Sequence, residues 1–393
     1  MKNALHSFMR RATDLTRTGR LREAVAELQA RFGVHSNFAR DDEPKSGGDH
    51  FYAKDIHAEH VPAENTQIPA LHGWQELLHP PPALIVEEIA ADSRSASFTD
   101  GSFEFNGKTH HYKLFVPGGT ILRARPMVVM LHGCTQDPAD FALGTDMNNI
   151  AGPAGWVVLY PAQSSFANYT KCWNWFKAGP EPGAGEPAWI ATLTRRIQDE
   201  HRVDPDRTFI AGLSAGAAMA VLTAELHGSL FKGVGVHSGL AAHAAGNVLE
   251  ALSVMKHGPS ARQKRYHSSG TDASNPIIPV IVFHGDADKI VDPENADQVI
   301  EAAIAQAKRA EPGLIVSEME NKGAATGTSY SQVIYAATSN RPIAEYWRLH
   351  GAGHAWSGGN DCGTHTDSSG PSASAEFLRF FGAVAPVSMD SVR

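Results

Sequence analysis

A serine flanked by two glycines offers the clearest chemistry in the sequence. Residues 212–216 are Gly-Leu-Ser-Ala-Gly, with an apolar run at 208–211 before them and a helix-forming run at 217–222 after them. This arrangement predicts a strand, a tight turn and a helix, with the serine at the start of the helix. Backbone N–H groups at that point stabilise a negatively charged oxygen. The pattern predicts that Ser214 is a nucleophile, and the alternative is a plain glycine-rich loop.

A serine nucleophile needs a base, and the base needs a carboxylate that orients it. The apolar run 279–283 predicts a buried strand, and Asp286 and Asp288 both lie in the segment that follows it. Hydrolases of this kind hold their acid in the loop after a late strand. We favour Asp288, because its spacing from Gly285 carries it past the end of the strand. Asp286 is the alternative, and the aspartate that is not the acid would cap the turn.

The base is expected on the next strand-to-loop junction. The chain has 20 histidines, so a histidine by itself means little. His354 stands out because it follows the strand predicted at 345–349, lies beside glycines and aromatic residues, and comes after the acid in the sequence. In the expected mechanism its Nε2 takes the proton of Ser214, while Asp288 accepts a hydrogen bond from its Nδ1. His350 is the alternative, at the end of the strand.

The remaining requirement is an oxyanion hole. The apolar run 127–131 predicts an early strand, and His-Gly-Cys-Thr-Gln follows it at 132–136. In α/β-hydrolases the loop after such a strand donates one N–H to the oxyanion, and the residue after the nucleophile donates another. These donors are expected to be Cys134, or a neighbour in its loop, and Ala215. The order of the signals along the chain predicts a serine hydrolase.

Together these motifs resemble a known family. The stretches that carry the resemblance span most of residues 100–385 and are 132–136, 172–176, 212–219, 284–291 and 353–359. They are similar to those of the polyhydroxybutyrate depolymerase esterases, the short-chain polyhydroxyalkanoate depolymerases with a type 1 catalytic domain. Esterases of plant biomass, which remove feruloyl and acetyl groups from xylan, share much of the pattern.

The resemblance implies an α/β-hydrolase fold, with a mostly parallel central sheet and helices on both faces. It also implies a triad of Ser214, Asp288 and His354 that hydrolyses poly- or oligo-3-hydroxybutyrate through an acyl-enzyme. A feruloyl or acetyl-xylan esterase is the alternative enzyme. A catalytically dead hydrolase fold that serves as a binding scaffold is the alternative outside enzymes.

The family motifs that contain Cys134 and Cys172 often lie close together, so the resemblance also implies a disulfide between these two cysteines. Cys362, the third of the 3 cysteines, would stay free. Members of the family are typically secreted, extracellular enzymes, whereas the sequence shows no signal peptide. A disulfide suits an oxidising compartment and reduced thiols suit the cytoplasm, so the compartment stays open.

Three tryptophans near these motifs are expected to bind substrate. Trp173 and Trp175 lie in the stretch predicted beside the oxyanion loop, and Trp356 follows His354. Their aromatic faces would hold an acyl chain or a sugar ring. The alternative for one of the first two is a place in the core.

Composition and charge exclude several other classes. A net charge of −8 and the lack of a basic stripe argue against a nucleic-acid partner. No apolar run approaches the roughly 20 residues of a membrane-spanning helix. No metal is expected, because His110, His111 and His132 lack the spacing and further ligand of a zinc site. No cofactor is expected either, since a serine triad needs none, and the expected partner is the ester substrate.

The first part of the chain has a different pattern. Residues 1–32 carry apolar groups at helical spacing, interrupted at Thr18 and Gly19, which predicts a helical hairpin. Such a hairpin packs on its own domain or mediates self-association. Residues 33–90 are polar and predict a linker, 91–385 the catalytic domain, and 386–393 a disordered tail. The catalytic domain is expected to begin with an antiparallel pair between Ser97 and Val116.

Overall fold

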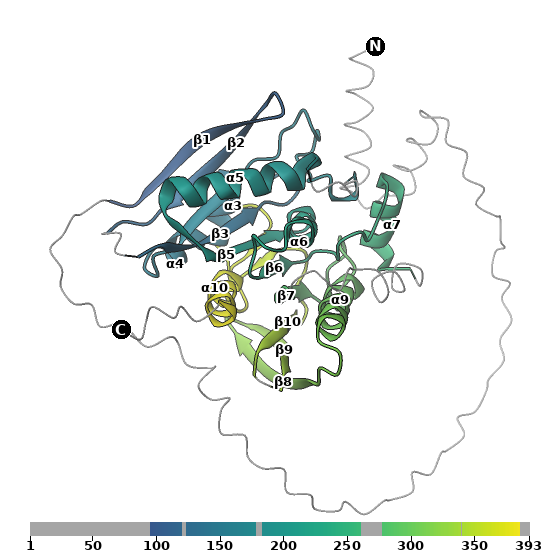
Figure 1. The fold of residues 1–393 in the computed structure, drawn as a ribbon. Helices are drawn as coiled ribbons and strands as arrows, with labels where there is room; N and C mark the ends of the chain where they lie inside the picture. Colours follow the sequence, from purple (N-terminus) through teal and green to yellow (C-terminus); the bar gives the residue numbers. More distant parts are fainter. Residues whose placement is uncertain (1–94, 120–122, 178–182, 261–276, 339, 386–393) are drawn as a thin grey trace, which may run out of the picture. The chain divides into compact units, whose positions relative to one another are not determined.

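The computed structural model describes residues 95–119, 123–177, 183–260, 277–338 and 340–385, and these form one large sheet with helices on both faces (Figure 1). The strands of this sheet are β1 (Ser97–Phe105), β2 (Lys108–Val116), β3 (Arg125–Leu131), β4 (Val157–Pro161), β5 (Val203–Leu213), β6 (Val234–His237), β7 (Val280–Gly285), β8 (Val316–Ala325), β9 (Thr328–Ala337) and β10 (Pro342–Leu349). A separate parallel pair joins β11 (Trp356–Ser357) to β12 (Thr366–Asp367).

The large sheet is parallel in its centre and antiparallel at both edges. Its strand order is β1-β2-β4-β3-β5-β6-β7-β10-β9-β8. Neighbours from β4 to β10 run parallel, while β1–β2, β2–β4, β10–β9 and β9–β8 are antiparallel. The central strands therefore place their carboxyl ends along one edge, where α/β sheets hold ligands.

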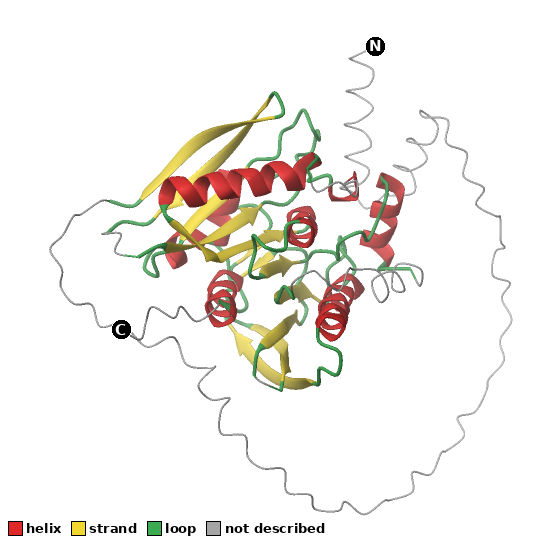
Figure 2. Ribbon diagram, in the orientation of Figure 1, coloured by secondary structure: helices red, strands yellow, loops and turns green. Residues whose placement is uncertain are grey.

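The helices divide between the two faces of the sheet (Figure 2). Contacts place α5 (Gly185–His201), α6 (Ala215–Leu226) and α9 (Glu294–Ala310) on one face, and α3 (Pro138–Thr145), α4 (Met147–Ala151) and α10 (Ala373–Val384) on the other. Helix α7 (Val248–His257) joins the apolar cluster of the first face. The short 3₁₀ helix η2 (Trp175–Lys177) contacts α6.

The alternation of side chains along β3 explains why both faces are covered. Every residue of β3 is buried. Met127 and Leu131 pack into the cluster of α5, α6 and α9, while Val128 and Met130 pack into the cluster of α10. A strand that is apolar on both sides belongs in a parallel sheet with a helix layer on each face. The predicted architecture, a mostly parallel sheet between helix layers, is confirmed.

Some predictions fall outside the described residues. They are the hairpin at 1–32, the linker at 33–90 and the tail at 386–393. The boundaries 91–385 of the catalytic domain stay a prediction, and the first described strand begins at Ser97. Among the described residues, no helix combines the length and the apolar character that a bilayer crossing requires.

Candidate active site

Ser214 lies in a strained turn between β5 and α6. Its φ of 57° and ψ of −122° place a non-glycine residue in a region that side chains rarely adopt. Although Ser214 holds the N-cap position of α6, its hydroxyl forms no capping hydrogen bond. The hydroxyl is thus not used to stabilise the helix, and strain of this kind gathers at functional sites.

The two glycines of this turn are needed because β3 runs against it. A Cβ at Gly216 would lie 2.1 Å from the carbonyl oxygen of Leu131 and 2.5 Å from that of His132. A Cβ at Gly212 would lie 2.6 Å from the same Leu131 oxygen. Any larger side chain would push the nucleophile turn away from the loop that begins at His132.

Asp288 follows β7 and is held from several sides. Its Oδ1 accepts hydrogen bonds from the backbone N–H groups of Ile290 (2.8 Å) and Val291 (3.0 Å). Its Oδ2 lies 2.7 Å from Nδ1 of His354 and 3.4 Å from Nε2 of His284. Burial alone would raise the pKa of this carboxyl, but the two histidines hold it well below its usual range. Asp288 is therefore an ionised carboxylate that orients His354.

His354 follows β10 in a loop that packs closely on β7. A Cβ at Gly285 would lie 2.2 Å from the carbonyl oxygen of Ala352, so only glycine allows this approach. Because Asp288 accepts the hydrogen bond, Nδ1 of His354 carries the proton, and Nε2 of the neutral ring is an acceptor. Within the described ranges, no hydrogen bond joins Nε2 to the hydroxyl of Ser214. Such bonds are often long before substrate binds.

The alternative acid and base pair with each other. His350 and Asp286 lie 2.9 Å apart, Nδ1 to Oδ2, and both side chains are more than a third exposed. Sequence order could not separate the two histidines or the two aspartates, whereas the structure sorts them into two pairs.

Cys134, in the loop after β3, and Ala215 are the expected oxyanion donors. In the described part of the chain, neither the N–H of Cys134 nor that of Ala215, the first residue of α6, has a hydrogen-bond acceptor. Thr135 has a φ of 68° and donates its N–H to the carbonyl of Thr170 at 2.6 Å. A β-branched residue rarely takes a positive φ. The backbone of this loop is therefore strained at Thr135, and its surroundings stabilise that conformation.

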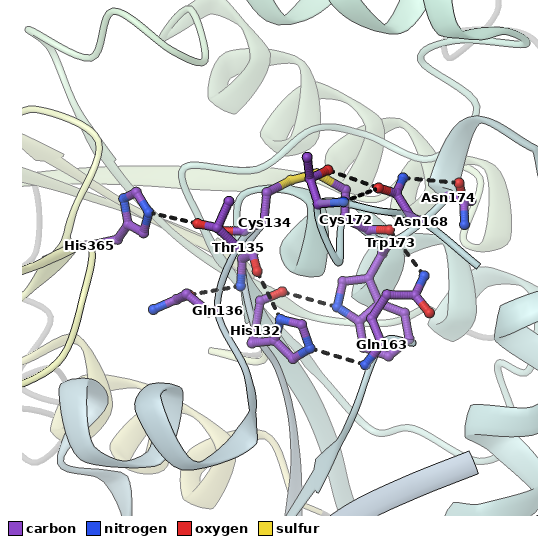
Figure 3. Close-up of a disulfide and its surroundings, with 12 residues drawn as sticks. His132, Cys134, Thr135, Gln136, Gln163, Asn168, Cys172, Trp173, Asn174 and His365 are labelled. Atoms are coloured by element: carbon purple, nitrogen blue, oxygen red, sulfur yellow. Dashed lines mark hydrogen bonds between the residues drawn. A yellow bond between two sulfur atoms is a disulfide. The ribbon is translucent and has the colours of Figure 1, made fainter. Parts of the chain in front are cut away.

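A disulfide and a buried polar network hold this loop (Figure 3). Cys134 and Cys172 form the disulfide that the resemblance implied, and Cys362 is exposed and unbonded. Nε2 of His132 accepts the N–H of Gln163 at 3.1 Å, so its proton lies on Nδ1. The side chain of Gln163 in turn donates to the carbonyl of Cys172.

The network ends on a half-buried glutamate at the start of α5. Glu186 accepts hydrogen bonds from Gln163 at 2.6 Å and from the backbone and side chain of Asn174 at 2.7 and 2.6 Å. Burial raises the pKa of Glu186, although these hydrogen bonds favour its charged form. Burial also lowers the pKa of His132 to about 4, which keeps its ring neutral. The network thus fixes the oxyanion loop from behind.

The expectation that the three tryptophans bind substrate is wrong for this structure. Trp173 and Trp356 are fully buried and Trp175 is 5% exposed. Trp173 donates to the carbonyl of His132 at 3.0 Å and packs on Trp189. Trp356 lies among aromatic side chains beneath α10 and donates to Ser374. These tryptophans pack beneath the loops of the site. Burial of their large apolar rings is favourable, so the rings lie in the core.

Sequence reasoning gave no role to several residues around the site. Gln163 and Glu186 brace the oxyanion loop, and His284 lies beside Asp288. His365 lies 3.4 Å from the hydroxyl of Thr135 at the mouth of the site (Figure 3). The sequence feature that these residues share is a polar side chain close to the end of a strand or the start of a helix. This feature is too common to identify them as site residues. Among the described residues, no group of three or more His, Cys, Asp or Glu side chains is placed to hold a metal ion.

Comparison with known proteins defines the family. Residues 110–309 match the model of the family described as Esterase PHB depolymerase, which covers half of the chain, and the chain belongs to this family. Poly(3-hydroxyalkanoate) depolymerase C of Paucimonas lemoignei is 28% identical over 259 residues, or 63% of this chain and 60% of the relative. Acetylxylan esterase A of Emericella nidulans is 25% identical, over 47% of this chain and 63% of the relative. The chain thus spans less than two thirds of the length of these curated relatives.

The fold also has solved counterparts. The acetyl xylan esterase from Aspergillus awamori superposes with a TM-score of 0.54 at 17% identity, over 72% of this chain and 99% of that one. The predicted α/β-hydrolase fold and the predicted family are both confirmed.

Proposed function

We propose that this protein is a serine esterase that hydrolyses poly- or oligo-3-hydroxybutyrate and related short-chain polyhydroxyalkanoates. The observation that carries the proposal is the buried His354–Asp288 pair at 2.7 Å, on the same edge of the sheet as Ser214. A carboxylate, an imidazole with an unprotonated outer nitrogen and a strained serine are the parts of a serine hydrolase.

In the proposed reaction, Nε2 of His354 removes the proton of Ser214 as Oγ attacks the ester carbonyl. The tetrahedral oxyanion receives hydrogen bonds from the N–H groups of Cys134 and Ala215, which have no acceptor among the described residues. The imidazolium then protonates the leaving alkoxide, and an acyl-enzyme remains. Water, deprotonated by the same nitrogen, hydrolyses the acyl-enzyme and frees Ser214.

A cavity lies between the β1–β2 hairpin and the start of α5, and its described lining residues do not include Ser214, Asp288 or His354. It has a volume of about 620 Å³ and is lined by Phe105, His110, Gln163, Phe166 and Trp189, among others. Gln163 connects its wall to His132 and so to the oxyanion loop. Its size and its largely apolar, aromatic lining are those of a small-molecule site.

The names of the relatives are compatible with either a polyhydroxyalkanoate substrate or a plant-biomass ester. Their names are those of polyhydroxyalkanoate depolymerases on one side and of acetylxylan and feruloyl esterases on the other. Trp173 and Trp356 are buried and so offer no face to either kind of substrate. A feruloyl or acetyl-xylan esterase is the second candidate.

A substrate panel with a matched blank tests the proposal. Purified protein and Ser214→Ala would be compared on 3-hydroxybutyrate oligomers, amorphous polyhydroxybutyrate, methyl ferulate and acetylated xylan. Release of 3-hydroxybutyrate by the wild type alone is the expected result. Turnover confined to methyl ferulate or acetylated xylan would move the function to the second candidate, and equal turnover by Ser214→Ala would refute the triad.

A further inference from the structure

His237 is a buried histidine between the strands that carry the nucleophile and the acid. It is the last residue of β6, which lies between β5 and β7 in the sheet (Figure 1). In the register, its backbone neighbours are Leu213, which precedes Ser214, and Phe283. Its side chain is fully buried. No role follows for it from the triad itself.

The backbone of His237 contacts the turn that contains Ser214. Its backbone carbonyl accepts the N–H of Ser214 at 2.9 Å. This bond extends the β5–β6 ladder by one residue, into the strained turn. Ser214 keeps its unusual backbone conformation only if its surroundings fix it, and this is one of the contacts that do so.

The ring of His237 holds the loop of the base. Nε2 accepts the N–H of Ser357 at 3.0 Å, three residues after His354 in the chain. Because a peptide N–H only donates, Nε2 is unprotonated, and Nδ1 carries the proton and donates to the hydroxyl of Ser238 at 3.2 Å. The ring also stacks on Trp356, with centroids 5.1 Å apart.

The surroundings keep this ring neutral. Its pKa is lowered to about 3, mainly by burial, with His284 and His354 also lowering it by charge and Asp288 raising it. Nε2 therefore stays an acceptor at pH values well above 3. A phenylalanine could fill the same space and stack on Trp356, but it could not accept the hydrogen bond.

We propose that His237 is a positioning residue of the triad, which ties the Ser214 turn to the His354 loop through its carbonyl and its Nε2. The inference rests on the proposed function in that Ser214 is the nucleophile and His354 the base. A displacement of about 1 Å between such groups costs on the order of 10²-fold in rate. Loss of the Nε2 acceptor acts on the chemical step and leaves substrate binding as it is.

Three substitutions of His237 separate the acceptor from the bulk of the ring. In His237→Gln the amide oxygen reaches the position of Nε2 and can accept from Ser357. His237→Phe keeps a stacking ring without the acceptor. In His237→Asn the amide ends near the position of Nδ1 and leaves Ser357 without a partner.

The readouts are the rate of covalent labelling by a fluorophosphonate, and kcat and KM on p-nitrophenyl butyrate, with circular dichroism to check the fold. We expect labelling and kcat to fall about 10- to 100-fold in His237→Phe and His237→Asn, with KM within about twofold, and we expect His237→Gln to recover most of the rate. If His237→Phe does not fold, the polar His237→Asn decides the outcome.

Labelling of His237→Phe and His237→Asn at the wild-type rate would overturn the inference, as would a loss in His237→Gln as large as in His237→Phe. A wild type that does not label at all would instead refute the triad on which the inference rests. Labelling depends on the activated serine and not on the natural ester, so an error about the substrate leaves this test intact.

Discussion

Two histidine–aspartate pairs lie at the carboxyl edge of the sheet, and the proposed function assigns catalysis to only one of them. His354 and Asp288 lie 2.7 Å apart, and their side chains are 11% and 0% exposed. His350 and Asp286 lie 2.9 Å apart, and theirs are 39% and 38% exposed. Distance alone does not distinguish them, because in both pairs Oδ2 of the aspartate lies within hydrogen-bond range of Nδ1 of the histidine.

The two pairs differ in the partner of the second histidine nitrogen and in the burial of the carboxylate. His350 uses its second nitrogen, Nε2, in a hydrogen bond with Ser331 at 2.8 Å. Nε2 of His354 has no such partner within the described residues. The carboxylate of Asp288 is also desolvated and fixed by two backbone N–H groups, so its charge acts on His354 through a low dielectric. A catalytic pair thus requires an unused nitrogen and a buried carboxylate, in addition to the bond between them.

The largest expected difference between the pairs is in the histidines. His354→Gln removes the base, and we expect kcat to fall by about 10⁵-fold or more, as for the histidine of other serine hydrolases. His350→Gln removes a surface contact, and we expect kcat to stay within about twofold. Steady-state rates on p-nitrophenyl butyrate measure both. A large loss in His350→Gln together with a small loss in His354→Gln would exchange the roles of the pairs.

The aspartates should show a smaller contrast of the same kind. Asp288→Asn leaves the shape of the site but favours the wrong tautomer of His354, and we expect a loss of about 10⁴-fold in kcat. Asp286→Asn should cost less than about threefold, because solvent screens an exposed pair. The same assay applies to both variants. Equal losses in the two variants would mean that burial does not select the acid.

The smallest expected effect is on stability against acid, and it compares buried with exposed histidines. Burial lowers the pKa of His132 to about 4 and that of His237 to about 3. Between about pH 6.5 and about pH 4 the unfolded chain therefore binds protons that the folded chain does not. The free energy of unfolding should fall as the pH falls, by about 1.4 kcal/mol per pH unit for each histidine, and the fall should end below the folded pKa.

Urea unfolding across this pH range measures the slope. His132→Gln should remove one buried histidine's share of the pH dependence, and His350→Gln serves as the comparison for an exposed histidine. An unchanged slope in His132→Gln would show that this histidine takes up a proton in the folded protein as readily as in the unfolded chain.

Local pattern predicted much of the fold and the order of the site. The apolar runs at 127–131, 208–211, 279–283 and 345–349 all became central strands, because a run buried on both faces has few other places to lie. The glycines beside Ser214 predicted a tight turn, and the structure supplies the reason in the carbonyl of Leu131. These features depend on the chain within a few residues, so the sequence displays them.

The tryptophans show where local pattern failed. Trp173 and Trp356 lie next to predicted site residues in the chain, yet their side chains point into the core. Proximity in sequence sets the position of a Cα and leaves the direction of the side chain to packing. The buried bracing of the oxyanion loop by Glu186 was missed for a related reason, since its partners Gln163 and Asn174 belong to other segments of the chain.

The sequence by itself determined the strand–turn–helix around Ser214, the parallel sheet, and the order of the proposed nucleophile, acid and base, since each follows from residue types at short spacing. Only the tertiary structure decided which aspartate pairs with which histidine, which histidine has an Nε2 without a partner among the described residues, and that His237 joins the Ser214 turn to the His354 loop. The physical reason is that burial and hydrogen-bond partners depend on the register between strands far apart in sequence, and no local pattern encodes that register.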